Sequence, residues 1–214
     1  MTAAVFQRGL LEHDCGVDLS GVHWVQGAVN SPSSHGDAAP MPLVKPADIE
    51  INASGKSLSD LLAAGEIDAI AGTGMPDSLK TSPDVVRLFP DFRAVEQDYY
   101  RRTQIFPIMH TIVLQRAVYE RDPSLAARLY TAFEAAKALA RKRMTRPATL
   151  AYMLPWMIEE LEDIERIFGG DPWPYGVEPN RLTLEALMTY LVEQDMIARP
   201  VPIEELFAPI GKPN

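Results

Sequence analysis

A helix followed directly by a strand is the pattern that most limits the folds open to this chain. A start resembling a capping box at Ser57 predicts a short helix that ends at Gly65, and residues 66–74 predict a strand entering a Gly-Thr-Gly turn. This order predicts an α/β fold with a parallel sheet. Gly72 and Gly74 either let backbone amides approach a ligand at the end of the strand or only form a tight turn, and the sequence favours neither.

An apolar segment in the middle of the chain, residues 108–114, predicts a buried strand because it is rich in β-branched residues. Pro107 stands at its start, where a missing N–H matters least. The segment contains one histidine, His110, and follows two tyrosines and two arginines at residues 99–102. A protonatable group after a cationic approach suits a site for an anionic aromatic ligand. The alternative is a packed core histidine, which is the commoner role for a lone histidine in a strand.

The rest of the pattern predicts a single α/β lobe followed by helices. Asp122 and Pro123 form a strong helix start, with Asp as the N-cap and Pro at the first helical position. The acidic residues between 159 and 165 have no histidine near them in sequence and are interpreted as a solvated helix face, with metal binding as the alternative. The remaining periodic segments predict helices over 2–14, 94–100, 122–143, 150–168 and 184–196, and strands over 22–25, 49–52 and 85–89.

Composition and charge exclude several classes of protein. The 47% of hydrophobic residues can build a core, while a net charge of -9 argues against a nucleic-acid-binding surface. Cys15 is the only cysteine, so neither an internal disulfide nor a cysteine metal cluster can form. No segment has the length of a membrane-spanning helix, and the N-terminus lacks the pattern of a secretory leader. A cytoplasmic location is therefore predicted.

Taken together, the motifs resemble those of the 4,5-dihydroxyphthalate decarboxylase family along nearly the whole chain. Two of them combine rare residues in order: Ile-Phe-Pro-Ile-Met-His at 105–110 and Asp-Pro-Trp-Pro-Tyr-Gly at 171–176. The others lie at residues 8–11, 23–25, 65–69, 87–90, 96–100, 153–156, 180–185 and 205–209.

The resemblance implies a type II periplasmic-binding-protein-like fold with two lobes, without the N-terminal part of the family. Residues 1–104 would form the second α/β lobe, lacking its first strand. Residues 105–214 would form a hinge strand and the C-terminal helical part of the first lobe. The absence of that first strand would explain why a helix is predicted at residue two, where an α/β chain normally begins with a strand.

The activity that the resemblance implies is that of a carboxy-lyase in phthalate degradation, which converts 4,5-dihydroxyphthalate to protocatechuate or acts on a related substrate. No cofactor is expected, because the dihydroxylated ring can itself accept the proton at carbon, and the sequence assigns no metal ligand. A small anionic aromatic substrate is the expected partner, with no nucleic acid or membrane involved and self-association left open. Two alternatives remain. One is a solute-binding protein of the nitrate, taurine or thiamine-precursor type, and the other is an inactive fragment.

Residue type and position, not a family assignment, suggest the roles in this chemistry. His110 is the candidate acid, with His23 in reserve, and Arg101 or Arg102 would hold a carboxylate. Thr2 and the amides that begin the first helix would form a second anion site. The residues expected to bind substrate, by stacking, hydrogen bonding or backbone amides, are Trp24, Tyr99, Tyr100 and Gly72.

Overall fold

The computed structural model describes residues 2–32, 43–45, 49–145 and 152–210. The chain divides into two compact units. The first unit comprises Met1–Asp98, Phe106–Met109 and Ala186–Pro200. The second unit comprises Tyr99–Ile105, His110–Glu185 and Val201–Asn214.

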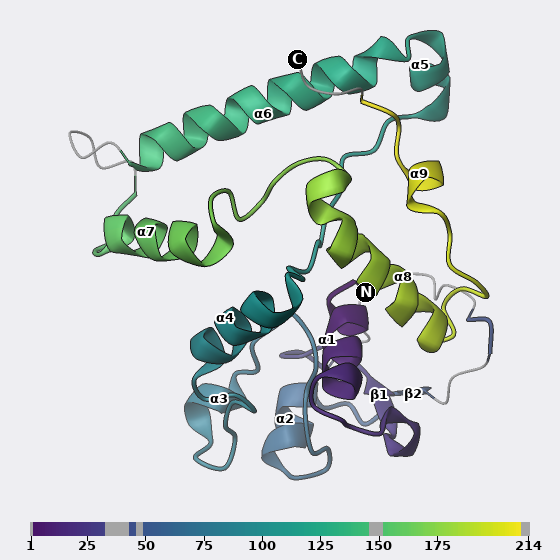
Figure 1. Ribbon diagram of the computed structural model, residues 1–214. Coiled ribbons are helices and arrows are strands. Elements are labelled where there is room, and N and C mark those ends of the chain that lie inside the picture. The colour runs from purple at the N-terminus through teal and green to yellow at the C-terminus, as the bar shows by residue number, and fades with distance from the viewer. Residues whose placement is uncertain (1, 33–42, 46–48, 146–151, 211–214) are drawn as a thin grey trace. The chain divides into compact units, whose positions relative to one another are not determined.

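The core of the first unit forms between helix α1, Thr2–His13, and the part of helix α8, Arg181–Glu193, that belongs to this unit (Figure 1). Val5 and Phe6 of α1 are almost completely buried, and the ring of Phe6 meets that of Tyr190 edge-on with centroids 6.1 Å apart. The side-chain amide of Gln194 donates a hydrogen bond of 2.9 Å to the carbonyl of Val5. The helix predicted over residues 2–14 is confirmed.

A two-stranded parallel sheet completes the α/β character of the first unit. Strand β1, Trp24–Gln26, pairs with strand β2, Ile49–Ile51, so that Trp24 lies opposite Ile49. Both strands were predicted, although β1 begins two residues later than expected. The prediction of a mixed fold with a parallel sheet is confirmed at this level.

Helix α2, Leu58–Ala63, begins as its sequence predicts. Ser57 and Asp60 form the reciprocal hydrogen bonds of a capping box, and Gly65 follows the helix with a φ of 70°, a conformation that favours glycine. The next helix, α3 at Ser78–Thr81, is tied to α2 by a hydrogen bond of 3.0 Å between the buried hydroxyls of Ser59 and Ser78.

Three predicted strands, over residues 66–74, 85–89 and 108–114, are wrong. The described residues in these segments form no strand. A strand needs a neighbour to accept its backbone hydrogen bonds, and the sheet in the described part of the chain consists of β1 and β2 alone. Apolar side chains therefore stay exposed, with Val86 75% exposed and Val113 84% exposed. Periodicity identified apolar segments correctly but could not supply their partners.

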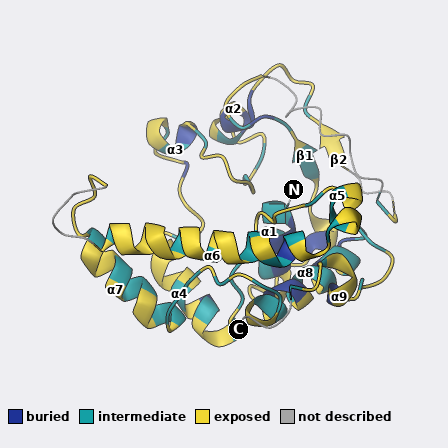
Figure 2. Cartoon of the chain, turned by 90° about the horizontal axis from the view of Figure 1, so that it is seen from above, coloured by how far each residue is buried: buried dark blue, intermediate teal, exposed yellow. Residues whose placement is uncertain are grey.

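The remaining helices are mostly in the second unit. The helix predicted from residue 122 is confirmed, but it begins one residue later than predicted. Pro123, not Asp122, is the N-cap of α6, and Asp122 accepts a hydrogen bond of 2.6 Å from the Ser124 hydroxyl. Among the described residues of α6 only Ala126 is buried, and the helix is largely exposed (Figure 2). The bounds are α4 Phe92–Thr103, α5 Arg116–Arg121, α6 Ser124–Met144, α7 Met157–Phe168 and α9 Ile203–Leu206, with 3-10 turns at Leu19–Gly21 and Glu178–Asn180.

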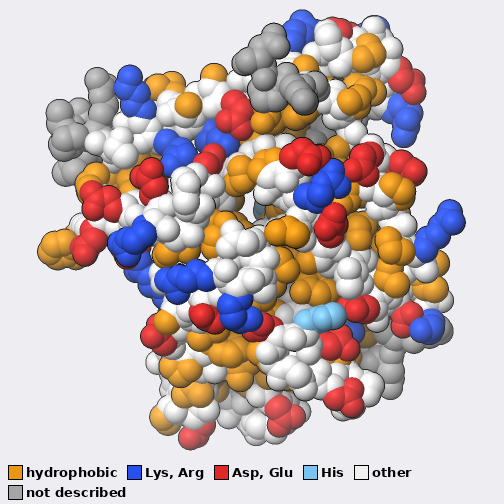
Figure 3. Space-filling model, in the orientation of Figure 1, with side chains coloured by type: hydrophobic (Ala, Val, Ile, Leu, Met, Phe, Trp, Pro, Cys, Tyr) orange, Lys and Arg blue, Asp and Glu red, His pale blue; other side chains and the backbone are white. Residues whose placement is uncertain are grey.

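The start of the helix predicted over 150–168 lies partly outside the described residues, and α7 begins after Pro155. In the described part of the chain, no helix combines the length and apolar character needed to cross a bilayer. Acidic and basic side chains are interspersed on the face shown in Figure 3, so neither sign of charge covers that face.

Candidate functional site

The residues that the sequence singles out fall in both units. Thr2, Trp24 and Gly72 belong to the first unit, whereas residues 99–102 and His110 belong to the second. Each group is described within its own unit.

In the first unit, Arg8 of α1 lies over the indole ring of Trp24 in β1, with the guanidinium carbon 4.8 Å from the ring centroid. Burial lowers the pKa of Arg8, and the nearby carboxylate of Glu12 opposes this shift. The Nε atom of Arg8 is buried and forms no hydrogen bond with any described residue. A partly desolvated cation with an unused donor next to an aromatic face is an arrangement that a carboxylate would complete.

The preceding residue of α1, Gln7, reaches the loop that contains Gly72. Its side-chain nitrogen donates a hydrogen bond of 3.2 Å to the Gly72 carbonyl, while its buried Oε1 atom has no hydrogen-bond partner in the described chain. Consecutive residues of one helix thus contact two of the predicted site residues, Gly72 and Trp24. Thr2, the third predicted residue in this unit, is half-buried at the start of the same helix.

Gln7 and Arg8 were not among the predicted site residues. Arg8 belongs to one of the family motifs, at residues 8–11. A signal was nevertheless present, because Arg8 lies between Phe6 and Gly9, two residues that are buried in α1. A charged residue close to the apolar face of a helix needs a partner, and that requirement identifies Arg8 as a candidate.

In the second unit, the predicted tyrosines and arginines occupy the last turns of α4. Tyr99 is buried, and the ring of Tyr100 stacks on that of Phe168 in α7 with centroids 4.3 Å apart. Arg101 and Arg102 are exposed, where positive charge interacts favourably with the carboxyl end of the helix dipole. The tyrosines are therefore engaged in packing, and the arginine side chains reach solvent.

His110 lies in an irregular segment and is exposed, not buried in a strand. The interpretation of His110 as a packed core histidine is therefore wrong. An exposed imidazole can exchange protons with solvent or with a bound ligand. Its role as a proton donor stays a prediction.

The second unit also contains a polar cluster centred on Lys137 of α6. Its ammonium lies 2.7 Å from Asp171, 3.1 Å from Glu134 and 3.8 Å from the centroid of the Tyr175 ring. Burial disfavours both charged groups. The hydrogen bond between Lys137 and Asp171 and the other polar contacts of the two groups outweigh burial. The pKa of Lys137 is therefore raised and that of Asp171 is lowered.

These contacts fix the loop at residues 171–176, which carries one of the family motifs. Lys137 also donates a hydrogen bond of 3.0 Å to the carbonyl of Trp173, and Asn180 donates to the carbonyls of Pro174 and Gly176. The Trp173 side chain itself is exposed. These contacts hold the loop in place within the second unit.

The comparisons with known proteins agree with the motif-based resemblance. None of the protein-family models matches the chain. A protein of Comamonas testosteroni named 4,5-dihydroxyphthalate decarboxylase is 32% identical over 212 residues, which is 98% of this chain and 63% of that protein. One of the same name from Pseudomonas putida is 34% identical over 104 residues, which is 47% of this chain and 39% of that protein.

The chain therefore spans just under two thirds of the length of the Comamonas testosteroni protein. The match extends across both units, since it takes in nearly every residue. The resemblance predicted from the motifs is confirmed: the chain is a homologue of the proteins named 4,5-dihydroxyphthalate decarboxylase.

Proposed function

We propose that the protein is a carboxy-lyase that removes one carboxylate from 4,5-dihydroxyphthalate or a closely related dihydroxylated aromatic dicarboxylate. The observation that carries the proposal is the match of 98% of the chain to a relative of that name. The bond between the ring and one carboxyl carbon breaks, its electron pair stays on the ring carbon, and that carbon takes up a proton. The products are carbon dioxide and 3,4-dihydroxybenzoate (protocatechuate).

Such a reaction requires a group that holds the carboxylate that is retained. Arg8 supports this role because its guanidinium is partly desolvated, has an unused Nε–H and lies over Trp24. The planar fork of arginine can hold a carboxylate with two hydrogen bonds, and the indole offers a face for the substrate ring. The buried Oε1 of Gln7 is an acceptor of the kind that a phenolic hydroxyl requires.

The other predicted residues keep their proposed roles. Arg101 or Arg102 would bind a carboxylate, and Thr2 with the first amides of α1 would form a further anion site. Tyr99, Tyr100 and the Gly72 backbone are further candidates for substrate contact. His110 would deliver the proton to the ring carbon, a role that an exposed imidazole can fill.

We also propose that the complete fold is that of the two-lobed type II solute-binding proteins. The parallel pair of strands with flanking helices in the first unit supports this fold. In the same proposal the substrate is the only partner required, no cofactor takes part and the reaction occurs in the cytoplasm. The dihydroxylated ring supports the absence of a cofactor, because it can itself accept the proton at carbon.

The proposal is tested by incubating the purified protein with 4,5-dihydroxyphthalate and, in parallel, with phthalate, which has the same two carboxylates and no hydroxyls. Chromatography should show 3,4-dihydroxybenzoate accumulating from the first compound and no product from the second. Saturable binding of 4,5-dihydroxyphthalate with no product would contradict the proposal and favour a solute-binding role. Turnover of phthalate at an equal rate would show that the hydroxyls have no part in the reaction.

A further inference from the structure

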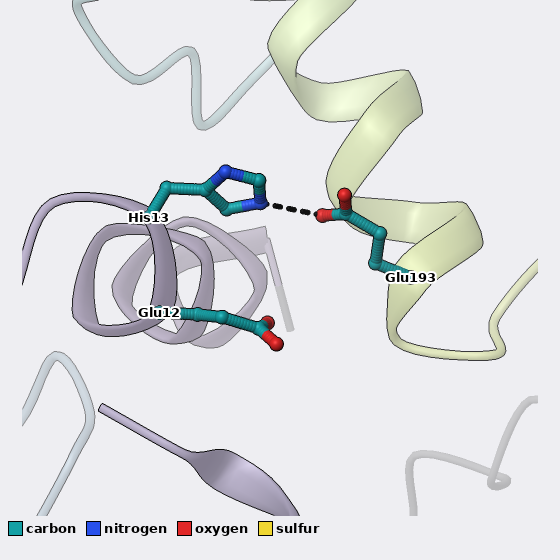
Figure 4. A group of neighbouring side chains, drawn as sticks. All are labelled: Glu12, His13 and Glu193. Carbon is teal, nitrogen blue, oxygen red and sulfur yellow. Dashed lines mark hydrogen bonds and ion pairs between the residues drawn. The ribbon is translucent and has the colours of Figure 1, made fainter. Parts of the chain in front are cut away.

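Three metal-binding side chains converge where the ends of α1 and α8 meet in the first unit. They are Glu12 and His13 from α1 and Glu193 from α8 (Figure 4). The Nε2 atom of His13 lies 2.7 Å from a carboxylate oxygen of Glu193, and one donor atom from each of the three residues lies within 4.8 Å of the other two. In the described part of the chain this is the one group of its kind.

We propose that Glu12, His13 and Glu193 bind a divalent transition-metal ion, for which Zn²⁺ is the best probe. One imidazole and two carboxylates are donors that Zn²⁺ accepts, and three protein ligands leave a fourth position for water. At a metal–ligand distance of about 2.0–2.1 Å, the donor atoms of a tetrahedral site lie about 3.3 Å apart. His13 and Glu193 need to separate slightly and Glu12 to swing inward, which rotations of exposed side chains allow.

The two helices that carry these ligands also pack against each other. Tyr190, one turn before Glu193, packs against the imidazole of His13 with ring centroids 5.2 Å apart. The ring of Tyr190 also fills the space above Gly9. Gln194, the residue after Glu193, is buried and bonded to Val5. His13 and Glu193 thus extend from a packed contact between α1 and α8. The binding of an ion therefore costs little conformational entropy.

The site has a structural role in this proposal, and one of its ligands, Glu12, also lies close enough to Arg8 to influence the pKa of that residue. His13 and Glu193 are 180 residues apart in sequence, so an ion held by both closes a very long loop of the chain. An ion that binds the folded protein and not the unfolded chain stabilises the fold by mass action. The sequence could not reveal this group, since no spacing motif links residues so far apart.

The test is a titration of the whole 214-residue protein with Zn²⁺ by calorimetry, combined with thermal unfolding. One ion per chain should bind, and saturating Zn²⁺ should raise the unfolding temperature. Glu12→Gln removes a ligand while leaving the bond between His13 and Glu193 intact, so the fold is preserved. We expect Glu12→Gln, His13→Ala and Glu193→Gln each to weaken binding by more than about tenfold, since even outer-shell losses cost about 10- to 100-fold.

His23→Ala is the matched control. His23 is also exposed and also bonded to a glutamate, with its Nε2 atom 3.0 Å from Glu50, but no third ligand joins that pair among the described residues. Zn²⁺ affinity should be unchanged in this variant. The proposal is overturned if no ion binds, if Glu12→Gln binds Zn²⁺ as tightly as the original protein, or if His23→Ala weakens binding as much as His13→Ala.

Discussion

Gly9 of α1 lies so close to Tyr190 of α8 that a Cβ atom added at Gly9 would stand 2.5 Å from the tyrosine ring. Nothing larger than glycine fits at this position unless the tyrosine ring or one of the two helices moves. Gly9→Ala should therefore destabilise the protein, even though alanine favours a helix over glycine by about 1 kcal/mol. Overpacking costs about 1–3 kcal/mol, so we expect a lower midpoint of urea unfolding.

Gly21→Ala is the control for this prediction. A Cβ atom at Gly21 meets nothing within 4 Å, and the backbone there does not require glycine. Its unfolding midpoint should stay close to that of the original protein. An equal effect of both substitutions would show that the contact between Gly9 and Tyr190 contributes nothing specific.

The ion pair between Lys137 and Asp171 should make stability depend on pH in the acid range. The pKa of Asp171 is lowered in the folded protein. Its contribution is fully present above the unfolded pKa of about 3.9 and is lost as the pH falls through the lower folded value. Asp171→Asn should thus flatten the loss of stability below about pH 4, as measured by urea unfolding at a series of pH values.

At alkaline pH the same pair acts through Lys137, whose pKa is raised. Its contribution is fully present below the unfolded pKa of about 10.4 and is lost as the pH rises through the higher folded value. At neutral pH, Lys137→Met should lower the free energy of unfolding by about 1.5–3 kcal/mol, the usual value for hydrogen bonds to charged groups. Lys56→Met, which breaks a more exposed pair with Glu66, should cost less. Equal losses would show that burial of Lys137 adds nothing.

Substitution of Arg8 tests its role in substrate binding. Arg8→Lys keeps the charge and removes the fork that holds a carboxylate with two hydrogen bonds. The KM for 4,5-dihydroxyphthalate should rise by about tenfold or more, with a smaller change in kcat, because the lost contact holds substrate and transition state alike. Arg116→Lys, at a side chain of α5 that is 88% exposed, should leave both constants unchanged. An unchanged KM in Arg8→Lys would remove Arg8 from the site.

His110 is the predicted proton donor, and His23 is the alternative. His110→Gln should lower kcat by about 10²- to 10⁴-fold, the usual contribution of a general acid. Its unfolding midpoint should not change, because the side chain is exposed. His23→Gln should retain most of the turnover. The reverse result, with turnover lost only in His23→Gln, would transfer the role to His23.

Local signals in the sequence predicted the helices well and the sheet poorly. The helix starts at Ser57 and at Asp122 and Pro123 are both signalled by adjacent residues. The structure confirms the capping box at Ser57, and it places the second start one residue later than predicted, with Pro123 as the N-cap. A strand depends on a partner elsewhere in the chain, and the apolar residues around Val86 and Val113 form none in the described structure. Periodicity therefore overestimated the number of strands.

The candidate site shows the same limit. Trp24 and Gly72 were predicted from residue type and position. Gln7 and Arg8, which contact them, were not predicted, although the position of Arg8 beside Phe6 and Gly9 was a signal for it. The group formed by Glu12, His13 and Glu193 depends on two helix ends that are far apart in sequence. Contacts of this kind form between residues far apart in the chain. No local pattern in a single sequence predicts them.

The most direct measurement of the central claim uses 4,5-dihydroxyphthalate labelled with ¹³C in both carboxyl groups, incubated with the protein in D₂O. We predict that one labelled carbon dioxide is released for each 3,4-dihydroxybenzoate formed. The ring carbon that lost the carboxylate should carry a single deuterium. Labelled substrate that stays intact after prolonged incubation with folded protein would contradict the claim that this chain carries out the decarboxylation.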